Sequence, residues 1–237
     1  MPLLELAQTT LSRLNRVKVS REGVDEAKAL DERCSELLQK TAPITRLAQN
    51  ANLLKNEGVR ISTVPEVSSV IETVNNVSAR FQELAKSTTL TQGRRWIGLT
   101  NKIDALTQKI TDVQNKDWEG YFENNFFGGP HPSQRSTRLA PTPYNERAME
   151  IYKELFYQFS KYRSKIPQDA DDFTTLRNLS NKLSKISFQE DVPVAVKRFF
   201  EETSSSTGAS LELLTMDVIE WLRSNNLLNN YNIRAKY

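Results

Sequence analysis

The feature that most constrains this chain is the spacing of its apolar residues, which recur alternately three and four positions apart in long segments. Residues 22–57 carry such a series at Ala27, Leu30, Cys34, Leu37, Thr41, Ile44, Ala48 and Ala51. Residues 90–125 carry another at Trp96, Leu99, Ile103, Leu106, Ile110 and Val113. This spacing places the side chains along one face of an α-helix, and seven-residue repeats are typical of coiled-coil packing. The sequence therefore predicts an all-α fold with long antiparallel, coiled-coil-like helices in residues 1–125.

Shorter segments follow the same rule. Residues 3–18 place Leu4, Ala7, Leu11 and Leu14 on one face, and residues 62–86 do so with a row of valines that ends at Phe81 and Leu84. Ser62 or Thr63 is the expected N-cap of the second of these helices. Pro43 interrupts the series of 22–57, so we expect a kink or a break near Thr41.

A Gly/Pro-rich segment, 126–143, separates the long helices from the C-terminal part of the chain. It contains two glycines and four prolines, and it is the expected domain boundary or exposed loop. A smaller helical domain is predicted over 144–237, with Ala148, Ile151, Leu155, Phe159 and Tyr162 on the core face of its first helix. Its last part, from about 193, has a short helix, a turn, a helix capped by Thr215 and one short strand at 231–233. This outline resembles a minimal winged helix.

The stretch GRRWIGLTNKID, residues 93–104, tests whether the chain binds a nucleotide. Gly93 and Gly98 have the spacing of a phosphate loop, and Asn101–Asp104 matches the N-K-x-D string that reads guanine in GTPases. The lysine that contacts the phosphates is replaced by Leu99, however, and no strand precedes the loop. Since Ile103 continues the apolar series, we interpret the stretch as part of a helix.

Charge and rare residues exclude several kinds of site. The net charge is +3, and a single cysteine and a single histidine leave no set of metal ligands. Cys34 is expected to be buried on its apolar series, and His131 to be exposed in the loop. No catalytic signature, signal peptide or membrane-spanning segment is recognisable. These observations predict a cytoplasmic, non-enzymatic protein without cofactors.

Two kinds of macromolecular partner remain open. Nucleic acid would be bound by the basic helix 144–165 and the tail, through Lys161, Arg163, Lys165, Arg234 and Lys236. A protein partner would be anchored by Leu227, Leu228 and Tyr231, because we expect that a short terminal segment cannot bury all three side chains. Pairing of the heptad series with a second copy of the chain is also open. We favour the protein partner.

The ending SLELLTMDVIEWLRSNNLLNNYNIR, together with the N-terminal coiled-coil helices, resembles small helical accessory proteins encoded beside bacterial ATPase or nuclease defence genes. The resemblance lies chiefly in residues 210–234. It implies a non-catalytic subunit or adaptor of a larger bacterial complex, with antiviral defence as the pathway and an ATPase or nuclease as the partner. The alternative is a nucleic-acid-binding module that uses the basic helix and the winged-helix-like unit.

Overall fold

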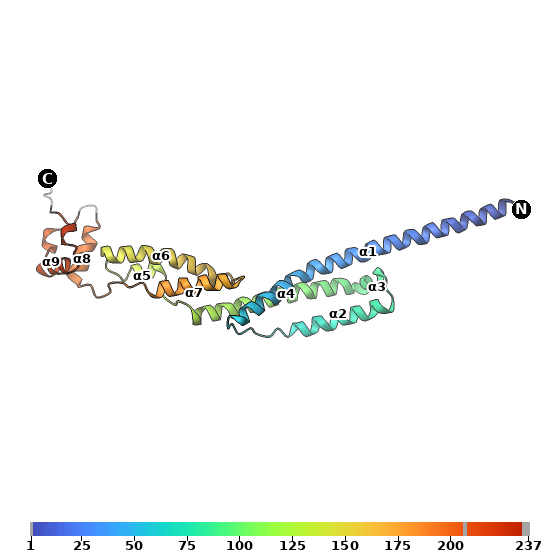
Figure 1. Cartoon of the computed structure of the whole chain (residues 1–237), viewed down its shortest axis with the longest axis horizontal. Coiled ribbons are helices and arrows are strands. Elements are labelled where there is room, and N and C mark those ends of the chain that lie inside the picture. The colour runs from blue at the N-terminus through green and yellow to red at the C-terminus, as the bar shows by residue number, and fades with distance from the viewer. Residues whose placement is uncertain (1, 206–207, 234–237) are drawn as a thin grey trace. The chain divides into compact units, whose positions relative to one another are not determined.

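The computed structural model describes residues 2–205 and 208–233, with side chains described from Thr10 onward. This part of the chain is all-α and contains no strand (Figure 1). None of its helices combines the length and the apolar character that crossing a lipid bilayer requires. The α-helices are α1 (Pro2–Asn56), α2 (Glu66–Glu83), α3 (Ser87–Thr91), α4 (Arg95–Asn125), α5 (Pro132–Ser136), α6 (Pro143–Ser164), α7 (Ala170–Ser184), α8 (Val194–Thr203) and α9 (Met216–Ser224). Three 3₁₀ turns, η1 (Gln92–Arg94), η2 (Leu211–Leu213) and η3 (Leu228–Asn230), complete the described set.

The chain divides into two compact units between Tyr121 and Phe122. Unit 1 comprises residues 1–121 and unit 2 comprises residues 122–237, so α4 contributes to both. The Gly/Pro-rich segment 126–143 belongs to unit 2. It contains the short helix α5, and Pro132, Ala140 and Thr142 are buried there. This segment is therefore part of a folded unit, and not an exposed loop throughout as the sequence suggested.

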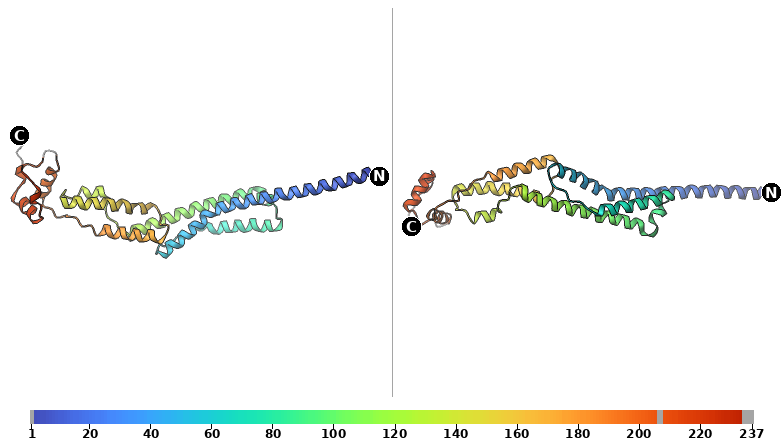
Figure 2. Two further views of the ribbon diagram at one scale, coloured as in Figure 1. Left: turned by 45° about the horizontal axis from the view of Figure 1, so that its top comes forward. Right: turned by 90° about the horizontal axis from the view of Figure 1, so that it is seen from below.

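Unit 1 is built from α1, α2 and α4, which lie side by side in every view of the ribbon (Figures 1 and 2). Hydrogen bonds join α4 to α1 and its last turn, and the residue numbers of the two partners increase together: Trp96 with Glu36, Asp104 with Lys40, Gln114 with Leu47 and Tyr121 with Glu57. These two helices are therefore parallel. The expectation of antiparallel helices is wrong for this pair. Helix α2 follows α1 in the chain and runs in the opposite direction, so α4, which reverses direction again, runs parallel to α1 (Figure 1).

The core of unit 1 lies along the series that the sequence marks on α4. Trp96, Leu99, Ile103 and Leu106 are buried, and Leu37 and Ile44 of α1 pack against the first three. Further along, Trp118 is 1% exposed and Leu54 is fully buried. Helix α2 contributes no fully buried residue, but its Val70 and Val77 pack against the same cluster while partly buried.

Of the two alternatives that the sequence left open near Pro43, a kink or a break, the break is excluded, because α1 is one helix from Pro2 to Asn56; it also joins the two segments that the sequence suggested were separate. One local prediction for unit 1 is wrong. Helix α2 begins after Pro65, and its N-cap is not Ser62 or Thr63. The backbone N–H and the hydroxyl of Ser62 instead donate to the Asp117 carboxylate of α4 at 2.7 and 2.8 Å. An anchor to a neighbouring helix replaces the expected cap.

Unit 2 contains the pair α6 and α7 and the smaller pair α8 and α9. Thr142 caps α6 by accepting from the Asn145 N–H, and the Asn145 side chain donates to the carbonyls of Ala140 and Gln189 at 2.9 and 3.0 Å. On α7, Phe173, Leu176, Leu179 and Leu183 are buried along one face at intervals of three and four, and Asp169 is the N-cap. The predicted face of α6 is partly wrong. Met149 and Tyr152 are buried, whereas Ile151 is 54% exposed.

The C-terminal part of unit 2 has its own cluster of buried side chains. Val196, Phe199 and Phe200 of α8 pack with Val218 and Leu222 of α9. Thr215 occupies the N-cap position of α9, as predicted, but its side chain makes no capping bond. The predicted strand at 231–233 is absent, because η3 precedes these residues and no neighbouring strand lies in the described part of the chain. The described part of the chain therefore lacks the strand that would form the wing of the predicted winged helix.

Candidate docking surface

The stretch that resembled a nucleotide site is helical. Gly93 lies in η1 with φ 65°, and α4 begins at Arg95, so Gly98 is inside a helix. Lys102 donates to the Thr73 hydroxyl at 2.8 Å, and Asp104 pairs with Lys40 at 2.5 Å. The polar residues of the string therefore bind neighbouring helices of unit 1, and the backbone offers no loop for phosphates.

The predicted protein-docking residues lie against the α8–α9 cluster. Leu227, Leu228 and Tyr231 are each partly buried there, and the Tyr231 ring packs at 5.4 Å from that of Phe199. Burial raises the pKa of the Tyr231 phenol. The short terminal segment buries more of these side chains than the sequence suggested, which reduces the apolar area that they offer to a partner.

The predicted nucleic-acid residues are not gathered by the structure into a described site. Lys161 and Lys165 are exposed near the end of α6, and Arg163 pairs with Glu123 at 2.5 Å. Arg234 and Lys236 lie outside the described residues. His131, an exposed residue as expected, is the N-cap of α5 and accepts from the Ser133 N–H. In the described part of the chain, no three His, Cys, Asp or Glu side chains are placed to hold a metal ion.

The clearest uncovered apolar surface is on the N-terminal part of α1. Leu11, Leu14, Val17 and Val24 are 62–66% exposed. They are three, three and seven positions apart, so they lie along one side of the helix, and we call them the α1 stripe. Leu4 and Ala7, which the sequence places on the same face, lie outside the described side chains. The ribbon shows α1 continuing past the ends of α2, α3 and α4 (Figures 1 and 2).

The stripe ends where α1 meets the rest of unit 1. The Glu26 carboxylate accepts from the backbone N–H and the hydroxyl of Ser87, and it thereby holds the start of α3. These two hydrogen bonds lower the pKa of Glu26. From Thr10 to Asp25 every described side chain is exposed, whereas beyond Glu26 Leu30 and Leu37 are half-buried. Cys34 is exposed, against expectation, because α1 turns its Arg33, Glu36 and Leu37 side toward its neighbours.

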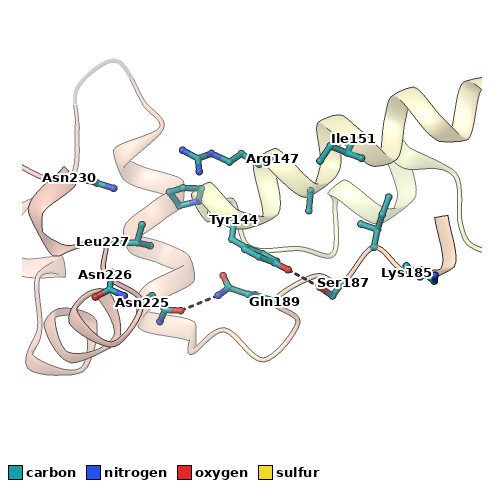
Figure 3. Close-up of a pocket in the computed structure, with 13 residues that line it drawn as sticks. Tyr144, Arg147, Ile151, Lys185, Ser187, Gln189, Asn225, Asn226, Leu227 and Asn230 are labelled. Carbon is teal, nitrogen blue, oxygen red and sulfur yellow. Dashed lines mark hydrogen bonds between the residues drawn. The ribbon is translucent and has the colours of Figure 1, made fainter. Parts of the chain in front are cut away.

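A second feature is an open cleft of about 720 Å³ in unit 2, between the start of α6, the segment 185–189 and the end of α9 (Figure 3). The Tyr144 hydroxyl lies 2.7 Å from that of Ser187, and Gln189 donates to Asn225 at 3.1 Å across the cleft. These bonds join the polar side chains of the wall to one another. The cleft is therefore explained as a seam between packed elements of unit 2.

Comparisons with known proteins give no relative. No protein-family model matches the chain, and neither a curated protein nor a solved structure matches it.

Proposed function

We propose that this chain is a non-catalytic helical subunit or adaptor that joins the parts of a larger bacterial complex. The observation that carries the proposal is the α1 stripe. Four aliphatic side chains in one row, each about two thirds exposed, are an unusual arrangement for a helix without a partner. Covering such a row with a second helix removes apolar surface from water, which is the main driving force for protein association.

The resemblance of residues 210–234 to accessory proteins of bacterial defence systems extends the proposal to a partner class. An ATPase or a nuclease would be held through α1, while unit 2 would present its own surface to another component. In this arrangement the chain binds and positions, and the chemistry belongs to its partner.

Co-expression with the products of neighbouring genes, followed by mass-resolved light scattering, tests the proposal. A co-eluting complex is expected, and the double variant Leu11→Gln, Leu14→Gln should dissociate it. The matched control is Ser12→Gln, Val19→Gln, which introduces the same side chains on the opposite side of α1, removes an aliphatic side chain that is 68% exposed there, and should leave the complex intact. Glutamine is a good helix former, so both variants keep α1 helical.

Two results would contradict the proposal. One is a complex that survives both double variants equally. The other is a monomer that binds no neighbour but binds duplex DNA with an affinity that falls steeply as salt rises. The second result would favour the nucleic-acid alternative, which Lys161→Gln and Lys165→Gln should then weaken.

A further inference from the structure

We infer that the partner covering the α1 stripe presents an acidic amphipathic helix; this inference rests on the proposed function and names the chemistry of its partner. Residues 10–21 contain Arg13, Arg16, Lys18 and Arg21 and no acidic residue. Arg21 lies within the apolar row itself, between Val17 and Val24. A partner with carboxylates beside its own apolar seam would neutralise these cations as it covers the stripe.

The cations of this segment are available for such pairing. Arg13, Arg16 and Arg21 form no ion pair within the part of the chain that the structure describes, and all three are exposed. Lys18 approaches Glu22 at 4.0 Å, with both side chains mostly in water, and a contact of this kind is easily exchanged. From Leu11 to Val24 the segment thus combines an uncovered apolar row with four basic residues and one acidic residue, Glu22.

A second copy of the chain fits this surface less well. In a parallel pair Arg21 would face Arg21 inside the apolar seam, and the four cations of each chain would lie side by side. In an antiparallel pair, the register that brings Asp25 opposite Lys18 and Glu22 opposite Arg21 also brings Glu32 opposite Leu11. The parallel pair places arginine against arginine, and the antiparallel pair places a leucine against a carboxylate. Neither arrangement therefore complements both the apolar row and the cations.

The composition of the stripe also favours a protein helix over nucleic acid or a lipid surface. Phosphates would be bound by the cations, but the leucines and valines would remain in water. A helix that lies on a membrane needs a broad apolar face and gains from aromatic anchors. Residues 10–25 contain no aromatic side chain, and the apolar row is one residue wide and interrupted by Arg21.

The test uses the full chain and a synthetic peptide of four heptads, with leucine at the two seam positions of each heptad and glutamate at the flanking positions. Such a peptide associates weakly with itself because its glutamates repel, so it is available to a basic helix. We expect it to bind the full chain, measured by titration calorimetry, at least tenfold more tightly than the same peptide with lysine at the flanking positions. Leu11→Gln, Leu14→Gln should reduce the affinity at least tenfold, and Ser12→Gln, Val19→Gln should change it less than twofold.

A charge variant, Arg13→Gln, Arg21→Gln, should weaken binding of the acidic peptide and make its salt dependence shallower, while circular dichroism confirms that helix content is unchanged. Four results would overturn the inference. Two concern the peptides: no detectable binding of the acidic peptide at about 100 μM by calorimetry, or equal binding of both peptides. The other two are a dimer of the chain alone that the leucine variant dissociates, and tighter binding to anionic phospholipid vesicles than to the acidic peptide. If the leucine variant still dissociates the co-expressed complex, such a result removes only the acidic helix and leaves the adaptor function standing.

Discussion

Replacing Pro43 with alanine should stabilise unit 1. Pro43 lies inside α1, where it has no N–H to donate to the carbonyl of Gln39, and its residue is exposed, so the ring contributes little packing. A proline in a helix interior costs about 3 kcal/mol relative to alanine. Alanine also loosens the unfolded chain, which offsets roughly 0.4–1 kcal/mol of that gain. The expected increase in the free energy of unfolding is therefore about 2 kcal/mol.

Urea unfolding followed by tryptophan fluorescence measures this change. Trp96 and Trp118 lie in unit 1 and Trp221 lies in unit 2, so a Trp221→Phe background restricts the signal to unit 1. With a denaturant slope of about 1–3 kcal/mol per molar urea, the midpoint should rise by roughly 1 M in Pro43→Ala. The control is Pro193→Ala in the unaltered chain, followed by circular dichroism.

The control separates an interior proline from one at a helix start. Pro193 is the N-cap residue of α8 and is exposed, and the N–H that it lacks has no acceptor within the helix. Its replacement should lower stability slightly, by less than about 1 kcal/mol, through the unfolded chain alone. An unchanged or lowered midpoint in Pro43→Ala would refute the reasoning, because it would mean that the local geometry of Pro43 is needed to bring Leu47 and Leu54 into contact with their neighbours.

Two further outcomes are expected, one in each unit. In unit 2, a Cβ added at Gly129 would overlap the Phe127 ring, so Gly129→Ala should lower the free energy of unfolding by about 1–3 kcal/mol, measured by thermal or urea unfolding. A Cβ added at Gly128 meets no atom, so Gly128→Ala should leave the free energy of unfolding unchanged. Equal effects of the two substitutions would contradict the packing at Phe127. In unit 1, the hydrogen bond from Trp96 lowers the pKa of Glu36 below its ordinary value of 4.5, so the carboxylate stabilises the fold above that pH and loses this effect as the pH falls through the lowered pKa. Trp96 fluorescence should report this acid-induced loosening in the native chain and not in Glu36→Gln, and an identical acid profile in the two would be inconsistent with it.

The apolar spacing predicted the helices because a row at intervals of three and four directly encodes one helix face. The row on α4 is confirmed: Trp96, Leu99, Ile103 and Leu106 are buried, and Ile110 and Val113 are half-buried. The row on α6 is confirmed at Phe159, which is buried, but not at Ile151, which is exposed. Tyr152 is buried instead, and its hydroxyl donates to the carbonyl of Pro130 in the neighbouring loop at 2.5 Å. A contact between residues so far apart in the chain leaves no mark on local spacing.

The candidate docking surface also shows that local apolar spacing does not predict contacts between distant parts of the chain. Leu11 and Leu14 follow the same rule as Leu30 and Leu37, and the sequence placed both pairs in helices without distinguishing them. The structure separates them: α3 and α4 reach the second pair, and no described part of the chain reaches the first. The spacing of apolar residues therefore shows that a helix face needs to be covered. Whether another helix of the same chain covers it depends on how far that helix extends. In α1 the contacts with the rest of unit 1 end at Glu26, and the row of leucines and valines that precedes Glu26 is where we propose that a partner protein binds.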